Sequence, residues 1–174
     1  MNLMDLLEKE GGGASIATLA RQLGVDKADA GKLIGALSPA LLGGLKEQAQ
    51  SAESRDGLVR AIESGNHQRY LEEPDRLSDE ATREDGNNIL GHLFGSKDVS
   101  RNVAARAAEN TGIDASLVKK ALPIVAALAM GAMGRKATAE SDNGGGLGAL
   151  TGLLGGSDGK FDFDDVRNLA GKFF

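Results

Sequence analysis

The chain has 174 residues, a net charge of −5 at pH 7, no cysteine and only 3% aromatic residues. The lack of cysteine excludes disulfides, thiol catalysis and thiolate metal sites. The acidic balance disfavours nucleic acid as a partner, because Lys and Arg supply most of that affinity. The first ten residues carry no basic segment before an apolar run, so we expect a cytoplasmic protein rather than a secreted one.

Apolar spacing in the first fifty residues predicts short amphipathic helices. The first should end at the glycines 11–13, and Ser15 is placed to cap the second. Gly-Val-Asp at 24–26 predicts a tight turn, since glycine suits the left-handed residue that ends a helix and aspartate caps the next one. Ser38 followed by Pro39 predicts that another helix begins at Pro39, where the missing amide hydrogen costs nothing.

Residues 46–86 differ from the rest in charge. They hold six basic and eleven acidic residues, so their net charge of −5 accounts for that of the whole chain. This composition predicts a solvated bridge with some helical structure. Apolar residues between 58 and 62 indicate one amphipathic helix, Tyr70 and Leu71 should anchor its exit, and Pro74 should interrupt it.

The turn at 24–26 returns as Gly-Ile-Asp at 112–114, and a proline follows each turn, at Pro39 and Pro123. The turn glycine and the proline are 15 positions apart in the first copy and 11 in the second. The difference of four is about one helical turn, which keeps the apolar face aligned. The chain therefore reads as a duplication of an all-α unit containing a helix-turn-helix. The matching helices should be 15–23 with 27–37 and 99–111 with 115–121.

The longest apolar run covers residues 121–133, which is too short to span a bilayer and is typical of a buried core helix. We therefore expect no membrane insertion. Beyond it, residues 138–146 are polar and glycine-rich and predict a flexible linker. The expected organisation is a first helical repeat at 1–50, an acidic helical connector at 51–86, a second helical repeat at 87–137, and a linker with a C-terminal amphipathic helix at 138–174.

The last residues of the chain predict a helix with one apolar stripe that needs a partner surface. The candidate partner-binding residues are Phe163, Val166, Leu169 and Phe173. Large apolar side chains are seldom left in water as a patch, so we expect them to dock on the same chain, on a second copy or on another protein.

Three stretches resemble a known family. GNNILGHLFGSKDVSRNVAARAAENTGID at 86–114, followed by LPIVAALAMGAM at 122–133, resembles the second half of the YidB-like family of bacterial proteins of unknown function. LARQLGVDKADAGKLIGAL at 19–37 resembles the corresponding segment of its first half. The resemblance covers residues 1–133 and implies an all-helical fold and a bacterial source. It implies no reaction and no catalytic residues.

The two turns have the spacing of a DNA-binding helix-turn-helix, but their charges disfavour DNA. The would-be recognition helix of the first copy sums to zero and that of the second to +1. The charged residues counted are Asp26, Lys27, Asp29 and Lys32 in the first, and Asp114, Lys119 and Lys120 in the second.

Residues 157–165 match the latter part of a calcium-binding loop, with Asp158, Asp162 and Asp165 as candidate ligands. In that register the first and third ligand positions fall on Leu154 and Gly156, which have no side-chain oxygen. The loop is therefore degenerate, and its alternative is a turn with an acidic first helical turn. We expect neither a metal nor a cofactor.

The remaining chemistry is sparse. His67 and His92 have no second ligand at metal spacing and should not be catalytic, and we expect His92 to be partly buried on a helix. No glycine run is followed by the Lys-Ser/Thr of a phosphate loop. The mixed charges between 97 and 106 predict a solvated face and a helix cap; these are Lys97, Asp98, Arg101 and Arg106. The expected function is a non-enzymatic interaction or scaffold module, with a protein partner or a second copy. The alternatives are weak DNA binding and an enzyme whose site is assembled only in three dimensions.

Overall fold

The computed structural model describes residues 3–139, and these residues form an all-α protein, as the sequence predicts. The expectations for the calcium loop and the apolar stripe fall on residues outside the described range, as do residues 140–146 of the expected linker. Thr138 and Ala139, which were expected in the linker, belong to helix α8. The helices of the described range are α1 Leu3–Lys9, α2 Gly13–Leu23, α3 Lys27–Gln50, α4 Ala52–Ser64, α5 Arg69–Glu72, the 3-10 helix η1 Pro74–Ser78, α6 Glu80–Phe94, α7 Lys97–Thr111 and α8 Ala115–Ala139.

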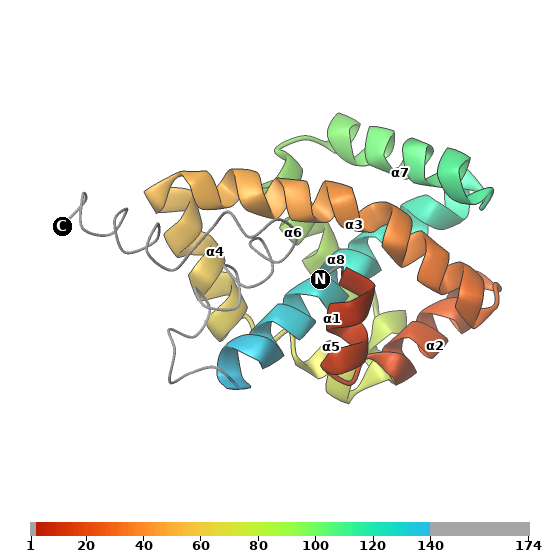
Figure 1. Cartoon of the computed structure of the whole chain (residues 1–174), viewed down its shortest axis with the longest axis horizontal. Helices are drawn as coiled ribbons and strands as arrows, with labels where there is room; N and C mark the ends of the chain where they lie inside the picture. Colours follow the sequence, from red (N-terminus) through yellow and green to blue (C-terminus); the bar gives the residue numbers. More distant parts are fainter. Residues whose placement is uncertain (1–2, 140–174) are drawn as a thin grey trace.

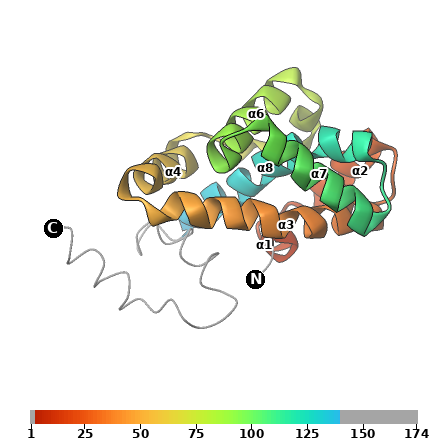
Figure 2. The ribbon, with the colours of Figure 1, turned by 90° about the horizontal axis from the view of Figure 1, so that it is seen from above.

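Helix α8 is the centre of the fold and contacts each of the other α-helices described (Figures 1 and 2). Every residue from Ala121 to Gly134 is buried. Many of these residues are alanine or glycine, so neighbouring helices approach α8 closely on all sides. By length and composition α8 could cross a membrane over Ala115–Thr138, but 83% of its most apolar window is buried inside the protein. The expected buried core helix is confirmed.

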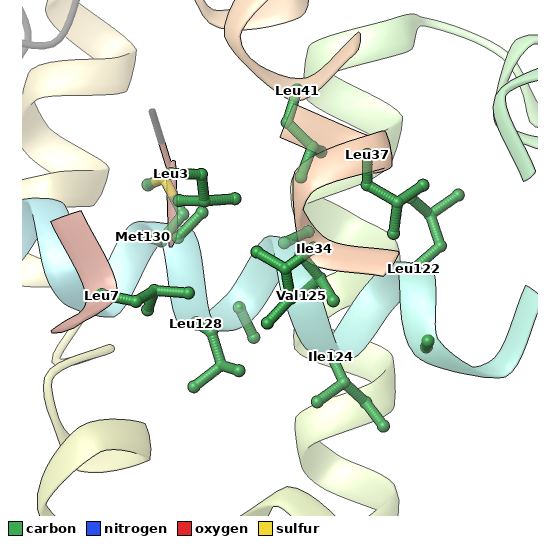
Figure 3. Close-up of a cluster of buried hydrophobic side chains, with 14 of the residues drawn as sticks. Leu3, Leu7, Ile34, Leu37, Leu41, Leu122, Ile124, Val125, Leu128 and Met130 are labelled. Carbon is green, nitrogen blue, oxygen red and sulfur yellow. The ribbon is translucent and has the colours of Figure 1, made fainter. Parts of the chain in front are cut away.

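Leucine, isoleucine and valine side chains from both ends of the described chain fill the space around α8. Figure 3 shows Leu3 and Leu7 of α1 beside Met130, and Ile34 of α3 beside Val125. All of these side chains are at most 2% exposed. At about 25 cal/mol per Å² of apolar surface, each such residue contributes roughly 1.5 to 3 kcal/mol. The core is therefore shared between the two halves of the sequence.

The expectation that a helix begins at Pro39 is wrong. Helix α3 runs without interruption from Lys27 to Gln50, with Pro39 in its interior. Ser38 does not cap a helix, since its Oγ donates to the Ile34 carbonyl one turn back at 2.7 Å. Pro39 lies on the exposed side of α3, while the opposite side is buried continuously from Leu33 to Leu45. Burial of that stripe offsets the roughly 3 kcal/mol that an interior proline costs a helix.

Both predicted turns have the geometry that their residues indicate. Gly24 and Gly112 end their helices in the left-handed region, at φ 69° and 72°. Asp26 caps α3 by accepting from the Asp29 amide at 2.7 Å, and Asp114 accepts from the Ser116 amide at 2.8 Å. The Ser116 hydroxyl and amide lower the pKa of Asp114. Each turn therefore fixes the crossing of two long helices.

The acidic connector is not a solvated bridge throughout. Its charges are mostly exposed, but Ile62, Tyr70 and Leu77 are buried in the common core. The connector fits because α8 has glycine where it approaches: a β-carbon at Gly131 would lie 2.6 Å from the His67 carbonyl oxygen. The expected helix around Ile62 and the anchoring by Tyr70 and Leu71 are confirmed. The expected interruption at Pro74 is wrong, since the helix around Ile62 already ends at Ser64 and Pro74 begins η1.

Ser15 has a different role from the one expected. Helix α2 begins at Gly13 with Gly12 as its N-cap residue and no side-chain cap. Ser15 lies inside α2, fully buried, and its Oγ donates to the Tyr70 carbonyl at 2.8 Å. This bond ties the first helices of the chain to the connector.

Candidate functional site

A polar cluster joins the connector to α6. Asp85 of α6 accepts from the Tyr70 hydroxyl at 2.6 Å, and its same oxygen lies 3.0 Å from Nδ1 of His67. The Arg69 guanidinium donates to the Tyr70 hydroxyl at 2.9 Å and lies over the Tyr70 ring. His67 is 7% exposed and Tyr70 1% exposed. One carboxylate therefore satisfies two buried polar groups that come from another segment.

Burial raises the pKa of Tyr70 above its ordinary value of 10.0, and the hydrogen bond to Asp85 adds to the effect, because the phenolate would face a carboxylate. The unfolded chain would then lose the Tyr70 proton at a lower pH than the folded protein. Stability should fall as pH rises above about 10, from the ordinary tyrosine pKa towards the folded one.

Tyr70 is the only tyrosine, and the chain has no tryptophan, so phenolate absorbance reports this group alone. In a spectrophotometric titration we expect a midpoint above that of the same chain in urea. Equal midpoints in the folded and denatured protein would show that Tyr70 is not desolvated as described.

The hydrogen bonds of the cluster connect side chains of two segments and thereby support the position of α6. A His–Asp pair orients an imidazole in many catalytic sites, but such sites also need an open cavity that holds the reacting group. The two hollows described next are lined by none of His67, Tyr70 and Asp85. We therefore interpret the cluster as the support that positions α6, and α6 as one wall of the candidate site.

Two adjoining hollows of about 460 Å³ and 410 Å³ form a groove between α6, α7 and α8. They share Asn87, Lys119 and Pro123. We call the two together the α6–α7–α8 groove. The 460 Å³ hollow is lined by Glu80, Arg83, Glu84, Asn87, Lys119, Lys120 and Pro123, and the 410 Å³ hollow by Asn87, Leu90, Gly91, Ser96, Lys97, Ser100, Arg101, Ala104, Lys119, Leu122 and Pro123.

Local sequence determines the shape of this groove. Gly95, at φ 73°, ends α6 in the left-handed region, and the Ser96 hydroxyl then caps α7 by accepting from the Val99 amide at 3.3 Å. Helix α7 therefore continues in a different direction from α6 (Figure 2). Lys97 and Arg101 of its first turns line the 410 Å³ hollow. At the other wall, Gly86 lets α6 touch the backbone of α8 at Pro123.

The charged side chains that line the 410 Å³ hollow are all cationic. Its rim carries Lys97 and Arg101 from α7 and Lys119 from α8, and no acidic residue lines it. Its apolar floor is formed by Leu90, Ala104 and Leu122, which are buried, and no other charged side chain lines it. Asp98 lies near, since it pairs with Arg101 at 3.4 Å on the exposed surface of α7. An anionic, partly apolar ligand suits this lining.

The structure brings together some of the residues that the sequence singled out. Lys97, Asp98, Arg101 and Arg106 are exposed, as expected of a solvated face, but Lys97 and Arg101 also line the groove. The expectation that His92 is partly buried is wrong, since it lies exposed on α6. No sequence pattern indicates the contact between His67 and Asp85, because the two residues are 18 positions apart, one in the turn before α5 and the other on α6.

The charges of the two helix-turn-helix segments lie on the surface. Lys32 of the first segment pairs with Asp29 at 3.3 Å, and Lys119 and Lys120 of the second are exposed at the groove. Two lysines give little phosphate neutralisation. We predict that affinity for duplex DNA is weak at physiological salt. A salt titration checks this, and tight binding that is lost in Lys119→Glu with Lys120→Glu would contradict it.

Residues 3–139 thus form an all-α fold with a groove open at its surface. A family model described as "Bacterial protein of unknown function (DUF937)" matches residues 5–136, so the chain belongs to this family, of which YidB is a member. Neither the curated proteins nor the solved structures contain a match to the chain. The resemblance to the YidB-like family is thereby confirmed.

Proposed function

We propose that the chain is a non-enzymatic protein-interaction module that binds an acidic, aromatic segment of a partner in the α6–α7–α8 groove. One observation supports this most: in a chain of net charge −5, the 410 Å³ hollow is lined by three cationic side chains and no acidic one. Such a lining attracts carboxylates and disfavours cationic ligands.

The lining suits carboxylates and aromatic rings together. The Arg101 guanidinium presents a planar fork that matches a carboxylate, and its face, like the lysine ammonium groups, attracts aromatic rings. The apolar floor between α6 and α7 accommodates a ring edge. Aromatic anchors in such hollows commonly carry most of the affinity of an interface, with charged pairs at the rim setting orientation and association rate.

Pro123 leaves one backbone carbonyl group of α8 without its helical hydrogen-bond donor. A proline has no amide hydrogen, so the carbonyl of Lys119 lacks its usual helical donor. Lys119, Pro123 and the amide of Asn87 line both hollows. Asn87, which lines both hollows, offers a bound peptide backbone an amide donor and an acceptor.

The experiment that tests the proposal is affinity capture followed by quantitative mass spectrometry. The baits are the full chain, a groove variant and a control of equal charge. The groove variant combines Lys97→Glu, Arg101→Glu and Lys119→Glu, and the control combines Lys9→Glu, Lys27→Glu and Arg106→Glu. All six residues are exposed, and Arg106 lies on α7 outside the lining.

We expect a protein that is captured by the wild-type chain and the control, and is depleted at least about tenfold by the groove variant, the equivalent of one lost charge-assisted hydrogen bond. Its binding should weaken with salt. Equal capture by all three baits would refute the groove as the binding site. Capture of nucleic acid would favour the DNA-binding alternative, and turnover of a small molecule would favour an enzyme.

We also propose that α2–α3 and α7–α8 are copies of one helix-turn-helix unit. The supporting features are the left-handed glycines, the capping aspartates, and the interior prolines of α3 and α8. A β-carbon at Gly24 or Gly112 would meet no atom within 4 Å, so Gly24→Ala and Gly112→Ala each add only backbone strain. We predict equal losses of about 1 to 2 kcal/mol in urea unfolding. Clearly unequal losses would speak against equivalent turns.

A further inference from the structure

We infer that residues 161–174 of the same chain dock in the α6–α7–α8 groove and compete there with the external partner. The inference rests on the proposed function, because it assigns the groove a resident occupant. The C-terminal segment would then act as an intramolecular competitor that lowers the affinity of the groove for the external partner.

The sequence of this segment complements the groove. Residues 161–165 read Phe-Asp-Phe-Asp-Asp, so two aromatic rings alternate with three carboxylates and no cation. The 410 Å³ hollow offers the reverse, three cations around an apolar floor. The remaining apolar residues of the stripe, Val166, Leu169 and Phe173, would then extend along the groove.

The length of the intervening chain fits docking within one molecule. Helix α8 passes the groove at Pro123 and ends at Ala139, sixteen residues or about 24 Å further along its axis. Residues 140–160 lead from there to the segment, and eight of these twenty-one residues are glycine. A glycine-rich chain of this length spans roughly 23 to 27 Å on average. The average span matches the distance, which is the condition for the highest effective concentration.

A short flexible tether gives an effective concentration in the millimolar range. Docking within the molecule therefore prevails over docking between copies at ordinary protein concentrations. An external partner must displace the segment, so its apparent association constant is the intrinsic constant multiplied by the fraction of molecules whose groove is free.

The test is a titration with a fluorescent synthetic peptide of residues 161–174 as the probe. Three full-length chains are compared: the wild type, a tail variant with Phe163→Ala and Phe173→Ala, and that tail variant carrying in addition Lys97→Glu, Arg101→Glu and Lys119→Glu. We expect the tail variant to bind the probe at least about tenfold more tightly than the wild type, because its groove is no longer occupied. The groove substitutions should abolish binding.

Light scattering on the same samples identifies which molecule the segment comes from, and we expect the wild type and the tail variant to be monomers. Equal affinity of these two chains for the probe, or no binding to either, would overturn the inference. A wild-type dimer that the tail substitutions convert to a monomer would show docking between copies and would overturn docking within the chain. Each of these outcomes leaves the capture experiment with the groove variant to decide the proposed function on its own.

Discussion

The substitution Gly86→Ala should destabilise the protein more than a Gly→Ala substitution at any other glycine of the described helices. A β-carbon at this position would lie 2.8 Å from the Pro123 Cα and closer still to the carbonyl carbon and oxygen of the same residue. Both elements are held from several sides, since α8 is the central helix and α6 is tied to the connector through Asp85. Overpacking of a core usually costs about 1 to 3 kcal/mol, and here the clash is with backbone.

We therefore expect Gly86→Ala to lower the free energy of unfolding by about 3 kcal/mol or more, and the melting temperature by roughly 6 to 12 °C for a chain of this size. Gly91→Ala on the same helix is the matched control, because a β-carbon there meets no atom within 4 Å. Better helix propensity should stabilise that variant by about 0.5 to 1 kcal/mol. Similar melting temperatures for the two variants would contradict the close packing of α6 on α8.

Removing the carboxylate of Asp85 should produce the second large effect. Asp85→Ala leaves the Tyr70 hydroxyl and Nδ1 of His67 without their shared acceptor, and both side chains are buried. A buried polar group left unpaired costs about 1 to 3 kcal/mol. We expect a total loss of about 2 to 4 kcal/mol in urea unfolding, lessened because Asp85 itself is 25% exposed and water reaches it.

Two further variants identify the cause of this loss. Glu84→Ala removes an exposed carboxylate from the neighbouring position of α6 and should be nearly neutral. Tyr70→Phe removes only the hydroxyl, and should cost about 1 kcal/mol in the wild type but less in Asp85→Ala, where the hydroxyl has already lost its acceptor. Strictly additive losses would show that Asp85 and Tyr70 do not act together.

The elements that the sequence predicted correctly depend on local signals. Gly24 and Gly112 end helices because glycine is the residue that adopts the left-handed conformation without strain, and the aspartates that follow two residues later cap the next helices. These interactions span only a few residues. The prediction that a helix begins at Pro39 failed for the converse reason. The preference of proline for the first turn of a helix is overridden here by a buried apolar stripe that continues on both sides of Pro39.

The connector and the groove depend on contacts between distant segments. The charge of the connector indicated solvation, but its few apolar residues bind α8 where Gly131 and Gly134 leave space, and no local pattern links glycines at 131–134 with residues near 67. Lys97 and Arg101 were correctly predicted to be exposed. That they line a hollow together with Lys119 follows only from the crossing of α7 over α8.

The most direct measurement of what occupies the groove is site-specific photo-cross-linking. The chain has no cysteine, so Gly91→Cys places a single photoactivatable label in the 410 Å³ hollow, and Gly43→Cys places the same label on the exposed surface of α3. A β-carbon meets no atom within 4 Å at either position. The account predicts that the label at position 91 is cross-linked to polypeptide segments rich in carboxylates and aromatic rings, including residues 161–174, and that Lys97→Glu with Arg101→Glu and Lys119→Glu abolishes the products. Products of equal yield and composition at positions 43 and 91, or products with nucleic acid at position 91, would contradict it.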